Sequence, residues 1–381
     1  MIAVFSIQTS HFNRMNPTAP RNHSLDALRA LAVAMVFAAH AIPLTAESPI
    51  WIERVATFGQ RGVDLFFVLS GYLIGSIVLR EFYGNGRISI FQFWRNRWYR
   101  TMPAYYVTLA LYLLKELVPH RSEGLGNPYS YIFFLQSYLV GHLTDFAHSW
   151  SLCVEEHFYL GLPLILFVTG LSGDKAREKF IILLVAASLA TILIRSALIV
   201  EGEDVYEKLS HWRTDGLAVG LLISALELRS HMFRRFTSEH FIICTTGTIV
   251  LIASAIWLHA VDSAHWQPVV ALACGGAVIL GVRQNSALES VGRLPFVAWA
   301  ARISYSLYLL HPLVLGALAL FYFSKHFHQP GFVLAYAALG LVISLIAAQL
   351  SYFFVERTFL NMRDRSRRPS SPDPIPASPR E

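Results

Sequence analysis

Residues with acid–base or anion-binding side chains interrupt the apolar runs of this sequence at helical spacing. Arg29 and His40 lie eleven residues apart, so on a helix they share a face and lie roughly 16 Å apart along the axis. Asp26 falls within about 40° of the same stripe. An imidazole can act as a general base, and a guanidinium can bind an anion. In the alternative interpretation, Arg29 reaches lipid headgroups and His40 only ends the helix.

A carboxylate stands at the start of a second apolar run. Asp64 follows Arg61 by three residues, and this spacing on a helix predicts an ion pair. The small residues Ser70 and Gly71 would let a neighbouring helix approach closely. An anchoring ion pair explains the motif, but the short segment before it places Asp64 at the same level as His40, where a carboxylate could serve in the chemistry.

A third polar motif runs from His148 to Tyr159. Within it Ser151, Glu155 and Tyr159 follow at i, i+4 and i+8, which forms one polar stripe on a helix. A second glutamate follows Glu155 directly. Ionisable residues inside a membrane span are costly and mark function more often than in a soluble protein, so packing alone is a poor explanation of this stripe.

Two arginines form a fourth motif in an aromatic context. Arg97 and Arg100 lie on one helical face among Trp94, Trp98 and Tyr99. Paired arginine donors bind phosphate groups, whereas aromatic rings seat a helix in the headgroup layer. A phosphate-bearing ligand and an orientation signal with lipid contact are therefore both open.

His311 is a fifth candidate because it precedes Pro312. A proline inside a helix leaves a backbone carbonyl free, which the histidine or a hydroxyl can satisfy. A structural kink is the simpler interpretation, and a place in the substrate site is the alternative.

The composition places these motifs in a membrane. Of 381 residues, 54% are hydrophobic and 15% are charged, against about 25% charged in an average soluble domain, and the mean hydropathy is +0.46. These values exclude a soluble enzyme. The net charge of +6 comes from arginines beside apolar runs, which indicates membrane orientation rather than nucleic-acid binding. The three cysteines form no close-set pair, so neither a disulfide scaffold nor a metal site is expected.

We therefore expect an all-α fold, a polytopic membrane bundle of about ten transmembrane helices with one or two further short or re-entrant segments. Basic segments alternate with poorly basic ones, which predicts that both termini are cytoplasmic. The expected organisation is a cytoplasmic N-terminal segment over 1–24, a transmembrane domain over 25–357 and a disordered cytoplasmic tail over 358–381. The run 128–141 is too short for a full crossing. The expected spans lie near 25–44, 62–79, 103–118, 151–171, 180–200, 214–228, 241–260, 268–282, 303–323 and 331–354.

Taken in order, the motifs resemble those of the acyltransferase-3 family of membrane acyltransferases, whose best-known members O-acetylate bacterial surface polysaccharides. The resemblance covers residues 25–357, nearly the whole chain, and it depends on five motifs occurring together in the expected order. These motifs are Arg29-x10-His40, Asp64-Leu-Phe-Phe-Val-Leu-Ser-Gly-Tyr, Arg97-x-x-Arg100 before Pro103, Trp150-Ser-Leu-x-x-Glu155-x-x-Phe158-Tyr159, and Ser304-Tyr-Ser-Leu-Tyr-x-x-His311-Pro.

The resemblance implies a multi-pass enzyme of the bacterial inner membrane that moves an acyl group, usually acetyl, from acyl-CoA to a hydroxyl of a carbohydrate or glycolipid. Acetyl-CoA would be a cosubstrate, and no permanently bound cofactor is expected. Some relatives carry a fused periplasmic hydrolase-type domain, so this chain is expected to act alone or with a separate periplasmic partner. Family members need the equivalents of Arg29, His40, Arg97, Arg100 and Glu155 for activity.

Acyl transfer to a hydroxyl needs a base, and we expect His40 to be that base. Glu155 or Asp64 would orient the imidazole and stabilise its charged form, as the second and third members of a triad do. A covalent acyl-His40 intermediate is an alternative. The candidates for the acceptor site are Trp150, Ser151, Tyr159, Arg61 and His311.

The donor would bind through its phosphates. Arg97 and Arg100 would hold the CoA phosphates at the cytoplasmic face, and Arg29 would steady the cosubstrate or polarise the thioester carbonyl. The base and the phosphate site then lie about half a bilayer or more apart, a gap that extended pantetheine could thread.

The main rival function is a transporter or flippase for a lipid-linked sugar, which also needs intramembrane charged residues. The sequence shows no internal repeat of the kind common in transporters. Labelled acetyl-CoA discriminates the two functions, because only an enzyme yields a labelled product.

Overall fold

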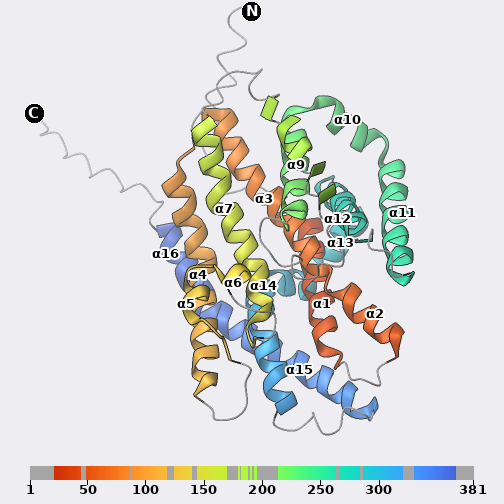
Figure 1. Cartoon of the computed structure of the whole chain (residues 1–381). Coiled ribbons are helices and arrows are strands. Elements are labelled where there is room, and N and C mark those ends of the chain that lie inside the picture. The colour runs from red at the N-terminus through yellow and green to blue at the C-terminus, as the bar shows by residue number, and fades with distance from the viewer. Residues whose placement is uncertain are drawn as a thin grey trace, which may run out of the picture.

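The computed structural model of the protein describes residues 21–43, 49–85, 88–117, 124–139, 144–169, 213–261, 266–283, 286–320 and 330–365, and short pieces between residues 179 and 194. Almost every described residue lies in a helix, and no strand occurs in this part of the chain. The expected all-α class is confirmed. Long helices form the body of the molecule, and shorter helices lie between and beside them (Figure 1).

The bounds of the helices follow the apolar runs closely. A 3-10 turn, η1, leads into α7, and a π-helical segment, η5, joins α15 to α16. In chain order, the described elements are α1 (His23–Ala41), α2 (Ile50–Gly59), α3 (Gly62–Asn85), α4 (Ile90–Glu116), α5 (Pro128–Ile132), α6 (Gln136–Leu139), η1 (Ala147–Ser149), α7 (Trp150–Thr169), α9 (Asp215–Arg229), α10 (His231–Glu239), α11 (Phe241–Ala260), α12 (Trp266–Val282), α13 (Ser286–Arg293), α14 (Pro295–Leu318), α15 (Pro330–Ser351), η5 (Tyr352–Glu356) and α16 (Arg357–Arg365).

Among the described residues, five helical segments are long and apolar enough to cross a membrane, or up to seven if each of two bent pairs counts as one span. The bundle is therefore multi-pass, but the ten expected spans are not all seen. The expected spans near 103–118 and 303–323 correspond to α4 and α14. Arginine and tyrosine residues in both helices, and His311 in α14, make them less apolar. The expected span near 180–200 lies mostly outside the described residues.

The short run 128–141 does not cross. It forms α5 and α6, of five and four residues, and neither helix is long enough to span a hydrocarbon core of about 30 Å. Phe134 lies between them with a φ of 56°, a left-handed conformation that ends one short helix before the next begins. This agrees with the prediction that the segment enters the bundle without crossing it.

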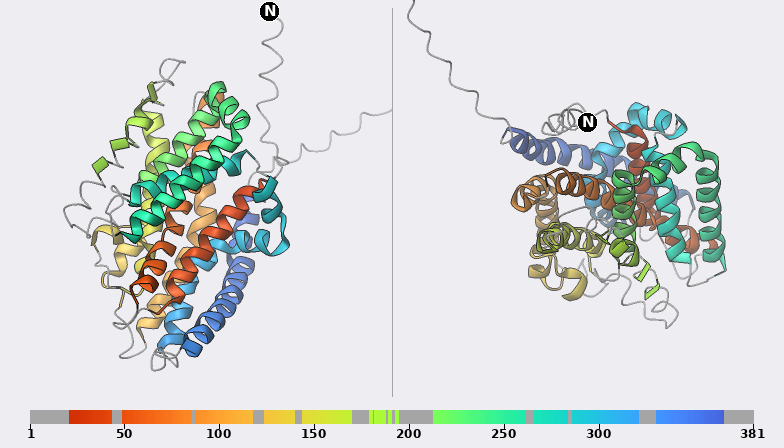
Figure 2. Two further views of the ribbon diagram at one scale, coloured as in Figure 1. Left: turned by 90° about the vertical axis from the view of Figure 1, so that its right-hand side faces the viewer. Right: turned by 90° about the horizontal axis from the view of Figure 1, so that it is seen from above.

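α1 and α14 run side by side in the same direction. Near their starts, the Arg21 guanidinium donates to the carbonyl of Ala298 at 3.2 Å. Near their other ends, the ring of His40 contacts the ring of His311. The two helices therefore carry residues from one end of the bundle to the other, and Figure 2 shows the long helices lying roughly along a common direction.

α3 and α9 run opposite to α1 and pack closely on each other. Gly62, at the start of α3, lies against Met35 in the second half of α1. A Cβ atom on Gly71 would lie 2.1 Å from the carbonyl oxygen of Leu217, and one on Gly220 would lie 2.1 Å from that of Val68. Close helix approach at Gly71 was expected from the sequence, and the structure confirms it.

These directions divide the bundle into two ends. The arginine end is the end that carries Arg29, Arg100 and Arg302. The histidine end is the end that carries His40, His148 and His311.

Both described ends of the chain lie at the arginine end, because Arg21 and Leu360 line the same cavity there. The expectation that both termini lie on one side fits this placement, while the cytoplasmic identity of that side stays a prediction. Residues 358–365, which the sequence assigned to a disordered tail, belong to helix α16, and the short segment expected before Asp64 contains α2. Residues 1–20 and 366–381 lie outside the described part.

Candidate active site

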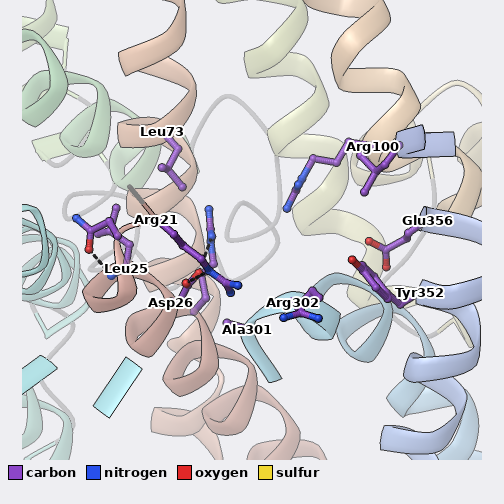
Figure 3. Close-up of a pocket in the computed structure, with 12 residues that line it drawn as sticks. Arg21, Leu25, Asp26, Leu73, Arg100, Ala301, Arg302, Tyr352 and Glu356 are labelled. Carbon is purple, nitrogen blue, oxygen red and sulfur yellow. Dashed lines mark hydrogen bonds and ion pairs between the residues drawn. The ribbon is translucent and has the colours of Figure 1, made fainter. Parts of the chain in front are cut away.

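The arginine end contains a cavity of about 300 Å³ between α1, α4, α14 and the C-terminal helices. Its lining holds four arginines and two acids, so positive charge dominates (Figure 3). The lining residues are Arg21, Asn22, Leu25, Asp26, Arg29, Leu73, Arg100, Ala301, Arg302, Tyr352, Glu356 and Leu360.

The first turn of α1 organises one wall of this cavity. The Asn22 side chain caps the helix by accepting a hydrogen bond from the Leu25 N–H at 3.1 Å, which satisfies one of the free donors of the first turn. Asp26 forms an ion pair with Arg21 and accepts a hydrogen bond from Arg29 at 3.2 Å. The single carboxylate of Asp26 therefore offsets part of the charge of two arginines.

The remaining two arginines are held less tightly. Neither Arg100 nor Arg302 donates a hydrogen bond to another described residue, although Arg100 is close enough to Glu356 for favourable electrostatic interaction. Glu356 itself is buried and accepts a hydrogen bond from Ser306. Guanidinium groups with unused donors are suited to bind an anion such as phosphate, because their planar fork matches its oxygens.

Arg97 does not line the cavity with Arg100, although a single turn separates them on α4. Its Nη2 donates to the Tyr159 hydroxyl at 2.5 Å, and its guanidinium carbon lies 4.1 Å from the centre of the Tyr159 ring. The Tyr159 hydroxyl also contacts Ser70 of α3. The two arginines expected to act together thus serve different places, Arg100 the cavity and Arg97 the middle of the bundle.

Glu155 and its neighbour Glu156 lie in the same middle region. Glu155 interacts with Arg97 and with the hydroxyls of Tyr159 and Ser70. Glu156 is buried and accepts a hydrogen bond from the Thr101 hydroxyl at 3.1 Å. Both acids therefore have polar partners inside the bundle.

At the histidine end, the ring of His40 packs against that of His311, with 5.0 Å between ring centres. His40 Nδ1 lies 2.8 Å from the carbonyl oxygen of Val36 and 3.3 Å from His311 Nε2. His40 is exposed, whereas His311 is fully buried. His311 was expected to line the acceptor site, but the structure places it inside the bundle, where it contacts the exposed His40 from the buried side.

A third imidazole, that of His148, completes this end. Its ring centre lies 5.9 Å from that of His311, and its Nε2 lies 3.2 Å from the carbonyl oxygen of Leu309. In the described part of the chain, no group of three or more histidine, cysteine, aspartate or glutamate residues is arranged to hold a metal ion.

The structure does not bring His40 into contact with Glu155, the pairing that the sequence favoured. Glu155 lies five residues, or about 7.5 Å of helix, beyond the start of α7, whereas His40 is the penultimate residue of α1. The carboxylate is therefore deeper in the bundle than the imidazole. Periodicity showed that each residue stands on a polar face, but it could not give the relative depth of two separate helices.

Asp64 is also not a partner of His40. Its carboxylate binds Arg213 Nη2 at 2.8 Å, and Arg61 Nη1 lies 3.6 Å from its other oxygen. All three side chains are buried. The expected i, i+3 pair of Arg61 and Asp64 is confirmed, but Arg213 is the closer cation, so this group reads as a structural ion-pair network near the start of α3.

The remaining acceptor-site candidates pack in the region between these groups. The ring of Trp150 lies edge-on to Phe67 at 5.9 Å and under the Arg213 guanidinium at 5.1 Å. The Ser151 hydroxyl lies 2.6 Å from the hydroxyl of Tyr308, which donates to the carbonyl of His148 at 2.8 Å.

Polar side chains thus continue from one end to the other. Electrostatic interactions without a direct hydrogen bond relate Arg29 to Arg97, Arg97 to Glu155 and Glu155 to Tyr308. Tyr308 in turn reaches His148. We call this series the polar column, made up of Arg29, Arg97, Tyr159, Glu155, Ser151, Tyr308 and His148.

Sequence reasoning missed several of these residues. His148 was missed because it precedes the polar stripe of its motif, which begins at Ser151. Arg21 and Arg302 were not singled out by any motif. Arg213 lies before α9, and nothing in its local pattern pointed to Asp64. A single signal was available for Tyr308, namely its place one turn before His311.

Comparison with known proteins supports an acyltransferase fold. A family model described as an acyltransferase domain matches residues 22–349. The peptidoglycan O-acetyltransferase OatA of Listeria monocytogenes is 27% identical over 363 residues, covering 87% of this chain and 55% of that protein. The O-acetyltransferase OatA of Staphylococcus aureus is 26% identical over 380 residues, covering 92% of this chain and 59% of that protein. The chain thus spans little more than half the length of these relatives, and no solved structure matches it.

Proposed function

This chain belongs to the acyltransferase domain family, and from that premise we propose that it is an integral membrane O-acetyltransferase. It moves an acetyl group from acetyl-CoA to a hydroxyl of a carbohydrate or glycolipid acceptor. The names of the relatives support acetyl as the acyl group. The donor and the acceptor class are inferred from the chemistry of the site.

One observation carries the proposal. The parallel helices α1 and α14 hold arginines around a cavity at one end and the His40–His311 contact at the other. An acyl-CoA needs anion recognition for its phosphates and a base near its thioester, and these two requirements are met on one pair of helices. Between the two ends, the side chains of the polar column can form hydrogen bonds with the amide groups of the pantetheine arm.

The donor phosphates bind at the arginine end. Arg100 and Arg302 supply unused guanidinium donors, and Arg29 and Arg21 add positive charge beside them. A cavity of about 300 Å³ is at the lower limit for ligand pockets. It therefore holds a phosphate-bearing part of the donor while the thioester arm extends along the polar column toward His40.

The reaction is then a direct transfer. His40 Nε2 takes the proton of the acceptor hydroxyl as its oxygen attacks the thioester carbonyl carbon. The carbon–sulfur bond breaks, and the CoA thiolate leaves and takes the proton from the His40 imidazolium. Glu155 and Arg97 lie along this path and hold the donor arm by hydrogen bonds, and the Tyr159 hydroxyl positions Arg97.

The arginine end faces the cytoplasm, where acyl-CoA is available, because basic segments are retained on that side. The histidine end then lies toward the outer face of a bacterial inner membrane, where it meets an acceptor inside or outside the bilayer.

The proposal is tested with purified full-length chain in liposomes. Acetyl-CoA labelled in the acetyl group is added on one side, with peptidoglycan fragments, lipid-linked oligosaccharide or simple glycosides as acceptors. The expected result is a labelled, base-labile ester on one acceptor class, absent in the His40→Ala variant. Movement of lipid-linked sugar without any labelled product would overturn the proposal in favour of a flippase.

A further inference from the structure

In the contact between His40 and His311, the other hydrogen-bonding partners of each ring determine which imidazole donates and which accepts. The two rings come from different helices and meet nearly at right angles, with an interplanar angle of 70°. An imidazole nitrogen either donates or accepts, depending on whether it carries the proton. The backbone atoms around each ring decide which nitrogen carries it.

His311 carries its proton on Nδ1. That atom lies 2.9 Å from the carbonyl oxygen of Leu307, one turn earlier on α14, and a carbonyl oxygen only accepts hydrogen bonds. Pro312 has no N–H to offer the carbonyl one turn before it, so the backbone here has spare acceptors. The Nε2 atom of His311 therefore keeps its lone pair, and this lone pair faces His40.

His40 carries its proton on Nδ1 as well. This atom lies 2.8 Å from the carbonyl oxygen of Val36 and 3.3 Å from the His311 Nε2 lone pair, so both of its neighbours accept. A His40 tautomer protonated on Nε2 would set three lone pairs against one another. The Nε2 atom of His40 is consequently the basic nitrogen, and His40 as a whole is an exposed residue.

We propose that His311 is the positioning residue for His40. The neutral imidazole of His311 shares with the Val36 carbonyl the single N–H of His40 Nδ1 as a bifurcated hydrogen bond, fixes the orientation of that ring and stabilises the imidazolium formed during transfer. This inference rests on the proposed function, and it identifies His311 as the residue that orients the general base His40. In the Ser-His-Asp arrangement a carboxylate fills this place; here a histidine fills it.

A neutral partner suits these surroundings. The ring of His311 is fully buried and lies beside Phe37, Tyr308 and His148. A buried carboxylate at this place would need further donors to offset its desolvation, whereas an imidazole held by a backbone carbonyl needs none. The two carboxylates that the sequence motifs offered as partners of His40 have other partners. Asp64 pairs with arginines, and Glu155 interacts with polar side chains in the middle of the bundle.

Two variants of His311 separate positioning from packing. His311→Phe keeps the ring volume and removes the acceptor. His311→Gln supplies an amide oxygen that can accept from His40 and an amide group that can donate to Leu307. The matched control is Tyr336→Phe, which removes a 3.2 Å hydrogen bond to the carbonyl of Leu315 on the same helix without touching His40.

In liposome transfer assays of the full chain, His311→Phe is expected to lower kcat about 10- to 100-fold, the usual cost of losing an orienting partner. The KM for acetyl-CoA stays within about twofold, since the donor phosphates bind at the other end of the bundle. His311→Gln keeps most of the activity, and Tyr336→Phe matches the wild type. The inference would be overturned if His311→Phe left kcat unchanged or changed only the KM. It would also be overturned if His311→Gln lowered kcat as much as His311→Phe does.

A second measurement does not depend on acyl transfer. Diethyl pyrocarbonate modifies the free lone pair of a neutral imidazole, and mass spectrometry of the peptide that contains His40 gives the rate. We expect slower modification of His40 in His311→Phe than in the wild type and near wild-type modification in His311→Gln. Equal rates in all three proteins would contradict the positioning role, whereas a wild type that modifies as expected but transfers no acetyl would leave the His40–His311 pair intact and remove the proposed function.

Discussion

The arginine end and the histidine end hold their polar groups in opposite ways. At the arginine end, charged guanidinium groups surround an open cavity, and two of them donate no hydrogen bond to another described residue. At the histidine end, uncharged imidazoles pack among aromatic rings, and backbone carbonyls hold their ring nitrogens. One bundle can therefore bind the donor at one end and carry out the chemistry at the other. Anion binding needs cations with unused hydrogen-bond donors, whereas a general base needs a free lone pair.

The largest expected effect lies at the histidine end. His40→Ala should lower kcat by about 10²- to 10⁴-fold, the usual contribution of a general base, and leave the KM for acetyl-CoA unchanged. Steady-state transfer kinetics in liposomes measure both. His240→Ala is the matched control, since its exposed ring stacks on Phe236 and belongs neither to the cavity lining nor to the His40–His311 contact. A His40→Ala enzyme within a few-fold of wild-type kcat would remove the base from this end.

The buried ion pair near the start of α3 should behave as structure rather than chemistry. Arg213→Met leaves the Asp64 carboxylate with only the more distant Arg61 and should lower the free energy of unfolding by about 3 kcal/mol. The midpoint of thermal unfolding in detergent measures this loss. The double variant Asp64→Asn with Arg213→Met should regain part of it.

Asp64→Asn decides the chemical question for the same pair. Its kcat per folded molecule should remain close to that of the wild type. Normal thermal stability together with abolished transfer would instead make Asp64 part of the catalytic machinery.

Changes at the arginine end should affect binding alone. Arg100→Ala with Arg302→Ala removes two unused guanidinium groups, and we expect the KM for acetyl-CoA to rise about 10- to 100-fold, as lost hydrogen bonds to charged groups predict. Acetyl-pantetheine, which lacks the nucleotide phosphates, should be used equally well by variant and wild type. Arg235→Ala, which breaks only an exposed pair with Glu239, is the control. A fall in kcat without a change in KM would contradict a phosphate site here.

The smallest effect is expected between the two ends. Tyr159→Phe removes the hydroxyl that accepts from Arg97 and contacts Ser70, a net loss of about 1 kcal/mol. We expect a roughly fivefold lower kcat with little change in KM. Ser76→Ala, which loses a hydrogen bond to Ser224 on the α3–α9 contact, should leave both constants unchanged, and a KM effect in Tyr159→Phe would assign it to donor binding instead.

Local patterns in the sequence predicted what lies on one element. The shared face of Arg29 and His40, the close approach at Gly71 and the pair of Arg61 and Asp64 all follow from helical spacing, and the structure contains the close approach and the ion pair. α1 indeed carries Arg29 to one end of the bundle and His40 to the other.

Contacts between elements could not be predicted in the same way. Helical periodicity gives the face of a residue but not its depth relative to another helix, so His40 was matched with Glu155 rather than with His311. Arg97 and Arg100 were expected to bind the donor phosphates together, yet tertiary packing puts Arg100 at the cavity and Arg97 over the ring of Tyr159. Fewer than the ten expected spans qualify among the described residues, in part because α4 and α14 carry polar groups of the site and are less apolar than ordinary spans.

The separation of binding from chemistry is tested most directly by a cryo-electron microscopy structure of the full chain with CoA bound. Phosphate density is expected against Arg29, Arg100 and Arg302, with the thiol end extended along the polar column toward His40. Phosphates bound away from these arginines, or a thiol end that leaves the bundle without approaching His40, would contradict it.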